Sequence, residues 1–230
     1  MIRSNLVSVI MPVYNSEDTV SKAIKSILNQ TFENIELIIG DDGSNDKTYD
    51  ICKDFEKDKP NIKIIKNEKN IGITKTLNKL IKESKGDFIA RQDADDFSSE
   101  KRIEEQLRYM KKNYLDACTT RARIIETDKV IPNLSFYLPK NIVIKYKNPF
   151  IHGSLMIKKE VLNEMNLYNE KFFYAQDYKL MYDLLGSQKK VRILNNTLYF
   201  INMENNISST YSEEQNYFAD CVRKNIDPAI

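Results

Sequence analysis

Short apolar runs and amphipathic stretches alternate along the first hundred residues. The apolar runs are rich in β-branched residues, and Pro12 and Gly40 end the first two of them, which is typical of buried strands. Between the runs, apolar residues recur at helical spacing, which is typical of helices with one buried face. The predicted strands are Leu6–Met11, Ile35–Ile39, Ile62–Ile65 and Asp87–Arg91. The predicted helices are Asp18–Leu28, Lys47–Glu56 and Ile73–Ile81.

This alternation predicts right-handed βαβ units and an α/β fold with a mostly parallel central sheet flanked by helices. The second half is less regular. Its predicted helices are Ser99–Tyr114, Lys159–Met165, Gln176–Leu185 and Glu213–Lys224, with loop and a short helix over Asp128–Asn148. Its predicted strands are Asp116–Glu126, Leu155–Ile157, Val191–Leu194 and Leu198–Asn202. Composition does not shift enough along the chain to place a domain boundary, so we expect a single domain over residues 1–230.

Composition narrows the class of protein. Of 230 residues, 41% are hydrophobic and 30% are charged, which suits a globular protein with a real core. The 35 basic and 33 acidic residues give a net charge of +2, which excludes a strongly basic nucleic-acid binder. No apolar run approaches the roughly 18 residues of a membrane helix, and no signal peptide is expected. Free thiols of a reducing, cytoplasmic compartment are expected from Cys52, Cys118 and Cys221, which form no CxxC motif.

Acidic side chains follow the second and fourth predicted strands, as Asp41-Asp42-Gly43-Ser44 and Asp93-Ala94-Asp95-Asp96. Because the carboxyl ends of parallel strands meet at one edge of a sheet, five carboxylates should converge there. Their mutual repulsion calls for a cation, and oxygen-only ligands suit Mg²⁺ or Mn²⁺ better than Zn²⁺. A multi-His metal site is impossible, since His152 is the only histidine. Each tetrapeptide alone could be an ordinary turn, but their equivalent positions favour a ligand site.

Neither a GxGxxG nor a GxxxxGK[ST] loop occurs, so a bound phosphate must be held by metal and side chains. Tyr14 could stack on a base, or serve as a rim aromatic. Asp42 could accept the N3–H of a uracil ring, or serve as a turn residue. Asp177 lies on the inward stripe of its predicted helix, at the end nearest the sheet edge, or is a helix N-terminal charge. The basic stretch 101–123 could be a solvated helix face or attract an anionic membrane.

Six segments together resemble glycosyltransferase family 2, the inverting nucleotide-sugar transferases with the GT-A fold. They are VSVIMPVYN (Val7–Asn15), ILNQTFENIELIIGDDGSND (Ile27–Asp46), NIGITKTLN (Asn70–Asn78), GDFIARQDADD (Gly86–Asp96), FIHGSLMIKKEVL (Phe150–Leu162) and FFYAQDYKLMYDLL (Phe172–Leu185). Their order and spacing cover roughly residues 6–200. The set is specific, whereas DDGS or DxD alone would not be.

The resemblance implies a role for each matching position. The uridine pocket would be lined by Pro12, Tyr14 and Asp42, and the nucleotide or its phosphates would lie near Lys75 and Asn78. The donor-sugar and metal residues would be Asp93 beside the ribose or sugar, Asp95 on the ion and Asp96 by the sugar. Asp177 falls where the family keeps its catalytic base, although the usual Glu-Asp pair is Gln176-Asp177 here. His152, alone more typical of a structural residue, would contact the diphosphate, metal or acceptor.

The activity implied is non-processive, inverting transfer of a hexose or N-acetylhexosamine from a UDP-sugar to a glycan or lipid-linked acceptor. It would use Mn²⁺ or Mg²⁺ and serve surface polysaccharide synthesis, in the cytoplasm or peripherally at the inner face of the cell membrane. Residues 1–97 would form the nucleotide-binding half and residues 98–230 the acceptor-binding half. The absence of tryptophan and of a Gln-x-x-Arg-Trp motif argues against a processive synthase.

Other classes of protein remain open at this point. One is a catalytically silent nucleotide-sugar-binding module or partner subunit. A receiver-type signalling domain would place its acids after the first strand and be shorter. A nucleotidyltransferase would need a Gly-rich loop where this chain has Pro-Val-Tyr-Asn.

Overall fold

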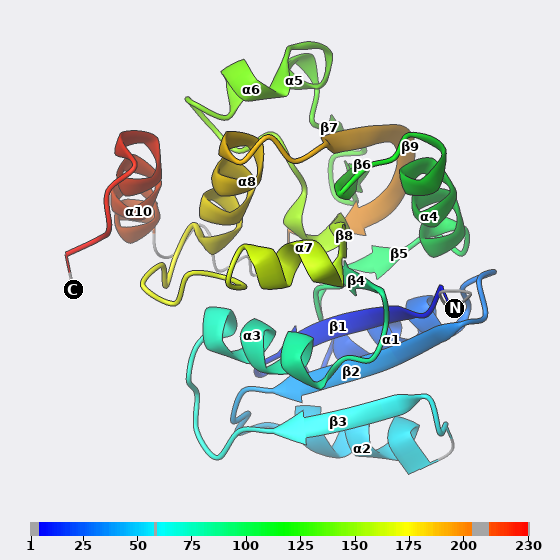
Figure 1. Cartoon of the computed structure of the whole chain (residues 1–230). Helices are drawn as coiled ribbons and strands as arrows, with labels where there is room; N and C mark the ends of the chain where they lie inside the picture. The colour runs from blue at the N-terminus through cyan, green and yellow to red at the C-terminus, as the bar shows by residue number, and fades with distance from the viewer. Residues whose placement is uncertain (1–4, 58, 204–211, 230) are drawn as a thin grey trace.

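The computed structural model describes residues 5–57, 59–203 and 212–229. A nine-stranded mixed sheet runs through it, in the order β3-β2-β1-β4-β8-β6-β9-β5, with β7 paired to β6 (Figure 1). The strands are β1 (Val7–Val13), β2 (Ile35–Asp41), β3 (Ile62–Lys66), β4 (Phe88–Arg91), β5 (Phe97–Ser98), β6 (Ala117–Ile124), β7 (Val130–Ile131), β8 (Met156–Lys158) and β9 (Val191–Ile201). The parallel registers, led by β1–β2 and β6–β9, are the longest, so the α/β prediction is confirmed.

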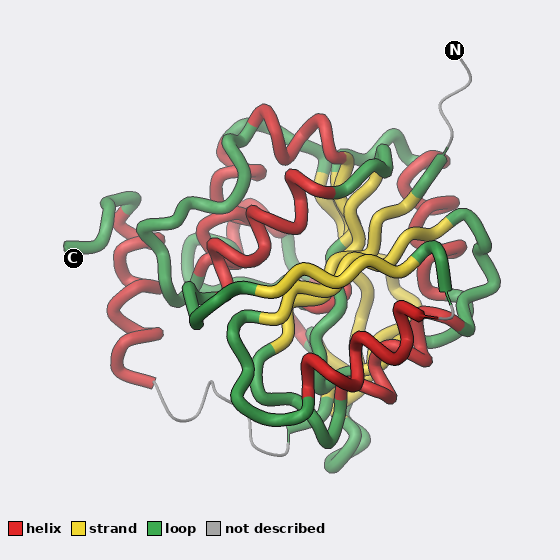
Figure 2. Tube along the Cα trace, turned by 90° about the horizontal axis from the view of Figure 1, so that it is seen from below, coloured by secondary structure: helices red, strands yellow, loops and turns green. Residues whose placement is uncertain are grey.

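Helices cover both faces of the twisted sheet (Figure 2). They are α1 (Val20–Leu28), α2 (Thr48–Lys57), α3 (Ile73–Glu83), α4 (Arg102–Lys112), α5 (Leu134–Tyr137), α6 (Lys140–Val143), α7 (Lys159–Glu164), α8 (Gln176–Gly186) and α10 (Ser212–Lys224), with a 3-10 turn η1 (His152–Ser154). Alternate residues of β1 serve the two faces. Val9 and Met11 join a core beneath α1, α2 and α4, while Ile10 joins the core beneath α3, α7 and α8.

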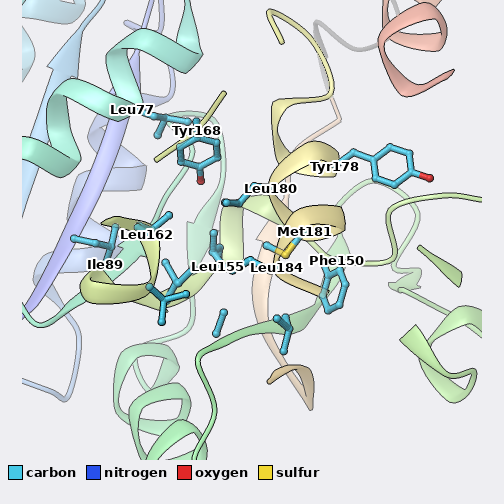
Figure 3. Close-up of a cluster of buried hydrophobic side chains, with 14 of the residues drawn as sticks. Leu77, Ile89, Phe150, Leu155, Leu162, Tyr168, Tyr178, Leu180, Met181 and Leu184 are labelled. Atoms are coloured by element: carbon cyan, nitrogen blue, oxygen red, sulfur yellow. The ribbon is translucent and has the colours of Figure 1, made fainter. Parts of the chain in front are cut away.

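The second of these cores holds α8 in place. The inward stripe of α8, with Leu180, Met181 and Leu184, packs beside Leu155 and Phe150 (Figure 3). These α8 side chains are at most 4% exposed. Burial of each such side chain contributes roughly 1.5–3 kcal/mol, so the helix N-terminus, where Asp177 lies, is fixed against the sheet.

Two predicted strand ends were wrong. Pro12 lies inside β1, where it is paired with Gly40 of β2. The amide of Gln92 donates to the Ile10 carbonyl, and the β1–β4 pairing ends there. The backbone nitrogen of Pro12 points to the side on which β4 no longer pairs, so the missing N–H of proline costs no hydrogen bond. Gly40 does not end β2 either. A Cβ there would lie 3.0 Å from side-chain atoms of Leu80 and Thr76, so glycine is needed for the close approach of α3.

The second half departs further from the sequence pattern. Val191–Leu194 and Leu198–Asn202 are parts of one strand, β9, because a register shift opposite Thr120–Ala122 absorbs the polar residues between them. The short elements β5, β7 and η1 were not predicted, and two short helices, α5 and α6, occupy the predicted loop. Such pieces carry too few residues to show a period, so tertiary pairing decides them.

Two compositional expectations can be compared with the coordinates. Cys52, Cys118 and Cys221 are free, as expected, and all three are buried. Within the described ranges, no helix combines the length and apolarity that crossing a bilayer would require.

Candidate active site

The site lies where the carboxyl ends of three neighbouring strands meet. β1 lies between β2 and β4, and its last residues pair with Gly40 and Asp41 on one side. Tyr14 follows β1 and is 40% exposed, and Asp93 follows the end of β4. The predicted convergence of these strand ends is therefore observed.

A cavity of about 680 Å³ opens beside this edge. Its acidic residues come from two separate regions: Asp93, Asp95 and Asp96 follow β4, and Asp177 lies in the first turn of α8. Its lining also includes Arg91, Asn148, His152, Gly153 and Gln176. Tertiary folding thus brings the acids of the first half and the aspartate of the second half to one cavity.

Arg91 fixes the carboxylate of Asp93. Its Nη1 and Nη2 atoms lie 2.6 and 2.5 Å from Oδ2 and Oδ1 of Asp93, a two-pronged ion pair. The Arg91 side chain is only 4% exposed, and its pKa is raised, because the charges of Asp93 and nearby groups more than offset the cost of burial. The Tyr199 hydroxyl accepts the Asp93 amide at 3.1 Å. Asp93 is therefore held in one orientation at the cavity wall.

Gly153 allows this arrangement. A Cβ atom at Gly153 would lie 2.2 Å from the Tyr199 hydroxyl and 2.6 Å from Oδ2 of Asp93. No side chain can stand there without moving one of them. The glycine of the Ile-His-Gly-Ser sequence is thus a packing requirement of the acidic turn, which the sequence pattern alone did not reveal.

The carboxyl groups of Asp95 and Asp96 both have raised pKa values. Partial burial, reinforced by the charge of Asp93, raises the pKa of Asp95 to about 6, although the residue as a whole is exposed to solvent. Asp96 is 6% exposed, and burial, followed by the charges of Asp93 and Asp95, raises its pKa to about 8. The Asn202 amide donates to Oδ1 of Asp96 at 2.9 Å and offsets part of this cost.

These raised pKa values show that the cluster favours added positive charge, which fits a hard divalent cation. Asp93 is already neutralised by Arg91, whereas Asp95 faces the cavity. Within residues 5–57, 59–203 and 212–229, no three His, Cys, Asp or Glu side chains form a metal cage. The donor set therefore fits an ion that takes one or two carboxylates here and its other ligands from phosphate and water.

Asp177 is placed by its helix and by Asn148. It lies in the first turn of α8, after Ala175 in the left-handed conformation with φ 54°. Nδ2 of Asn148 donates to Oδ2 of Asp177 at 2.8 Å. Burial raises the pKa of Asp177, while hydrogen bonds from the Tyr178 amide and Asn148 act in the opposite direction. A carboxylate with a raised pKa is a better proton acceptor than an ordinary aspartate.

His152 is a neutral member of the cavity lining. Its Nε2 atom lies 2.8 Å from the Tyr168 hydroxyl. Burial, with the nearby charge of Arg91, lowers the pKa of His152 well below 6.5. At neutral pH the ring therefore carries no positive charge for a diphosphate.

Of the five carboxylates that the sequence places at this edge, Asp41 and Asp42 do not line the cavity. β2 continues through Asp41, which pairs with Lys66 of β3 and is fully buried. Asp42 accepts hydrogen bonds from the Asn67 side chain and the amides of Ile71 and Gly72, each 2.9 Å long. A carboxylate offers about four lone-pair positions, so little of Asp42 is left for a base. Through the amides of Ile71 and Gly72, Asp42 holds the loop before α3.

Lys75 and Asn78 lie on different sides of α3. Lys75 is exposed and lines a neighbouring hollow of about 510 Å³, which shares Ile73, Phe173 and Tyr174 with the main cavity. Asn78 is buried, donates to the Tyr168 carbonyl at 2.9 Å and accepts the Tyr168 amide at 3.0 Å. Asn78 thus joins α3 to the segment that carries Tyr168, rather than facing the cavity.

The solvated-face interpretation of residues 101–123 was wrong for Arg102. This guanidinium is fully buried, donates to the Arg91 carbonyl at 3.0 Å, and lies 5.5 Å from the Tyr199 ring centre. Burial lowers its pKa to about 10, so it remains charged at neutral pH. Arg102 places a positive charge directly behind the acidic turn.

Several site residues were missed by sequence reasoning. Asn148 ends a stretch without periodicity, so nothing marked it. Arg91 could have been noticed, because a charged residue closing an apolar strand beside acids is unusual. Tyr199 is an ordinary strand residue in the pattern, and only the turn around Asp93 gives its hydroxyl a function.

Comparison with known sequences identifies glycosyltransferases as relatives of this chain. The model of a family described as glycosyl transferase family 2 matches residues 8–179. A Haemophilus influenzae protein named as an uncharacterized glycosyltransferase is 30% identical over 95% of this chain and 72% of its own length. The Escherichia coli protein WfgD, a UDP-Glc:α-D-GlcNAc-diphosphoundecaprenol β-1,3-glucosyltransferase, is 32% identical over 78% of this chain and 70% of its own length.

Solved structures share the fold. Staphylococcus aureus TarS 1–349 in complex with UDP-GlcNAc superposes with a TM-score of 0.77 at 20% identity, over 90% of this chain and 61% of that one. The mannosyltransferase PcManGT from Pyrobaculum calidifontis, in complex with GDP-Man and Mn²⁺, gives a TM-score of 0.75 at 15% identity, over 96% of this chain and 65% of that one. At these identities the likeness establishes the fold, which is GT-A as the sequence predicted.

Proposed function

The chain belongs to glycosyl transferase family 2, and we propose that it is a non-processive, inverting enzyme. It would transfer a hexose or N-acetylhexosamine from a UDP-sugar to a hydroxyl group of a glycan or lipid-linked saccharide. WfgD, whose name gives a UDP-sugar donor and a lipid-diphosphate acceptor, supports both choices. The UDP-GlcNAc complex of TarS supports a UDP-sugar on this fold. The process would be surface polysaccharide assembly, which the diphosphoundecaprenol-linked acceptor in the name of WfgD supports.

One observation carries the proposal. Asp177 and the acidic turn Asp93–Asp96 line the same cavity, from opposite parts of the chain. Its volume of about 680 Å³ falls within the roughly 300–1,000 Å³ of small-molecule sites. A donor sugar held between the two groups would present one face to Asp177 and the other to its leaving diphosphate.

The chemistry is a single displacement at the anomeric carbon. The acceptor oxygen forms a new C–O bond, the bond to the diphosphate breaks, and UDP leaves with the electron pair. Asp177 takes the acceptor proton as its oxygen attacks, because its carboxylate is desolvated and oriented by Asn148. Inversion follows from attack on the face opposite the leaving group.

Mn²⁺ or Mg²⁺ would be held by Asp95, with Asp96 and Asp93 beside it, and would supply charge stabilisation for the departing diphosphate. Arg91 keeps Asp93 oriented for a ribose or sugar hydroxyl. His152 offers a neutral ring to the same cavity.

The nucleotide would lie along residues 1–97. Tyr14 would stack on the base above Pro12, where the end of β1 leaves both accessible in part. Asp42 would contact uracil through its remaining lone pair and shape the loop before α3. Lys75 would reach the phosphates from the neighbouring hollow. Asn78 would act indirectly, by holding that region to Tyr168. Residues 98–230 would form the acceptor side.

The test is a screen for release of the nucleoside diphosphate over a panel of UDP-sugars and GDP-sugars with Mn²⁺, with and without simple saccharide acceptors. We expect one UDP-sugar to give acceptor-dependent release. Turnover of GDP-sugars alone would overturn the donor assignment. Tight UDP binding without release on any acceptor would instead identify a catalytically silent binding module.

A further inference from the structure

Large apolar side chains are exposed along residues 134–146, on the short helices α5 and α6 and on the turns beside them. The two helices lie at one end of the molecule (Figure 1). Five of the twelve exposed large hydrophobic residues in the described ranges fall within residues 134–146. They are Leu134, Tyr137, Leu138, Ile142 and Tyr146, with exposures of 78, 73, 54, 54 and 71%. We call these five residues the α5–α6 patch.

The segment that carries the patch is anchored. Its inward residues Val143 and Ile144 are buried, at 6 and 3% exposure. The Tyr178 hydroxyl of α8 donates to the Ile144 carbonyl at 2.7 Å. The backbone of this segment is therefore held in place while its apolar side chains face solvent, and such a grouping of exposed apolar residues favours a contact site.

The charged side chains of the segment that carries the patch all have one sign. Residues 129–150 contain four lysines and no aspartate or glutamate, although the whole chain has a net charge of only +2. Lys129, Lys145 and Lys147 are exposed, the last two on either side of Tyr146. The fourth, Lys140, donates to the carbonyls of this segment and helps to fold it.

The patch adjoins the acceptor side of the cavity. Asn148, which lines the cavity and contacts Asp177, is two residues beyond Tyr146. Two residues span at most about 7 Å. Arg223 of α10 also donates to the Tyr146 carbonyl, at 3.3 Å, so this end of the patch is tied to the helix beside α8.

We propose that the α5–α6 patch docks on the surface of a membrane that contains anionic lipids. Aliphatic side chains can enter the headgroup boundary, tyrosines suit the interface because one end of the ring is polar, and lysines attract anionic headgroups. The absence of any acid from residues 129–150 favours this negatively charged partner over a protein surface of mixed charge. The biological purpose rests on the proposed function: docking would present a lipid-linked acceptor to the cavity beside Asp177.

The experiment is co-sedimentation of the full chain with vesicles of phosphatidylcholine alone, or of equal parts phosphatidylcholine and phosphatidylglycerol. We expect salt-sensitive binding to the anionic vesicles and much weaker binding to the neutral ones. The charge variant K145Q/K147Q should bind roughly 30-fold more weakly, since each lysine near an anionic surface is worth about fivefold. The apolar variant Y137S/I142S should lose binding at high salt as well as at low salt.

Matched controls keep the test specific. K59Q/K85Q removes two exposed lysines elsewhere, and Tyr114→Ser removes a tyrosine that is 80% exposed outside the patch. Both should bind vesicles as the unchanged protein does, and thermal melting should show that all variants fold. Equal binding to both kinds of vesicle, or full binding by the patch variants, would overturn the proposal. So would a lack of vesicle binding with patch-dependent dimers in light scattering, which would assign the surface to a second copy.

The outcome is separable from that of the proposed function. Patch variants should release UDP on a soluble acceptor at the rate of the unchanged protein. Vesicle binding without UDP release would support the docking surface and contradict the enzymatic proposal. UDP release without vesicle binding would support the enzymatic proposal and contradict the docking surface.

Discussion

The side-chain amide of Asn148 donates a 2.8 Å hydrogen bond to Oδ2 of Asp177. Asn148 in turn is held by the Phe150 amide, which donates to its Oδ1 at 3.0 Å. One residue thus links the wall of the cavity to the proposed base and selects the orientation of its carboxylate. The carboxylate of Asp177 also lines the cavity, where a substrate can reach it.

Removing the carboxylate should separate catalysis from binding. Asp177→Asn should lower kcat by about 100-fold or more, the usual worth of general base catalysis, while the affinity for UDP changes little. Calorimetry and UDP release would measure the two quantities. Asp183→Asn is the matched control, because Asp183 lies on the same helix but pairs with Lys179 at 2.7 Å. A large loss of UDP affinity with unchanged turnover would contradict the assigned role.

Loss of the Asn148 contact should change the pH profile of activity. The hydrogen bond favours the charged form of Asp177, so Asn148→Ala should raise the pKa of Asp177 further. The base must be ionised to act, and activity should therefore fall off at higher pH on the acid side of the profile than in the unchanged protein. Asn141→Ala, on the exposed side of α6, is the control. An unshifted acid limb in the kcat profile would show that Asn148 does not act through Asp177.

Asp95 should link donor binding to a divalent ion. Asp95→Ala is expected to weaken UDP binding in Mn²⁺ and to abolish the difference between Mn²⁺ and EDTA, measured by calorimetry. Asp54→Ala, which removes an acid that is 72% exposed on α2, should leave both affinities unchanged. Equal UDP affinity of the unchanged protein in Mn²⁺ and in EDTA would remove the metal assignment.

Asp96 should make the stability of the metal-free protein depend on pH. Its pKa is raised to about 8 in the folded state, so its stabilising contribution is full below the pKa of an unfolded aspartate and is lost as pH rises through about 8. Urea unfolding in chelator should show a free energy of unfolding that declines from pH 5 to pH 8. Asp96→Asn, which cannot ionise, should flatten that decline. Asp50→Asn, at an exposed position of α2, should leave the decline unchanged. An identical decline in Asp96→Asn would contradict the raised pKa.

Gly153 should tolerate no side chain. Gly153→Ala places a Cβ 2.2 Å from the Tyr199 hydroxyl, and overpacking of this kind costs about 1–3 kcal/mol. Thermal melting should show a clear loss of stability, and donor binding should weaken because Asp93 must move. Gly186→Ala is the control, since nothing lies within 4 Å of the added Cβ at the end of α8. A Gly153→Ala protein with unchanged stability would show that the close approach is not required.

The sequence by itself determined the strand and helix order of the first half, and the resemblance of six segments identified the GT-A fold. These features are local, because a buried strand or an amphipathic helix is written in consecutive residues. The ends of β1 and β2 were misjudged, since Pro12 and Gly40 are ordinary strand ends in isolation. Pro12 can stay in β1 because β4 does not pair beside it. Gly40 is needed in β2 because α3 approaches it closely.

Tertiary structure alone decided the arrangement of the site. Asp95 and Asp177 lie far apart in the sequence but line the same cavity. They meet there because α8 packs against β8 and α3. It also decided which acids are available: Asp41 and Asp42 are drawn into strand pairing and loop contacts, and Arg91 neutralises Asp93. Such outcomes depend on distances between atoms far apart in the chain, and no local pattern encodes them.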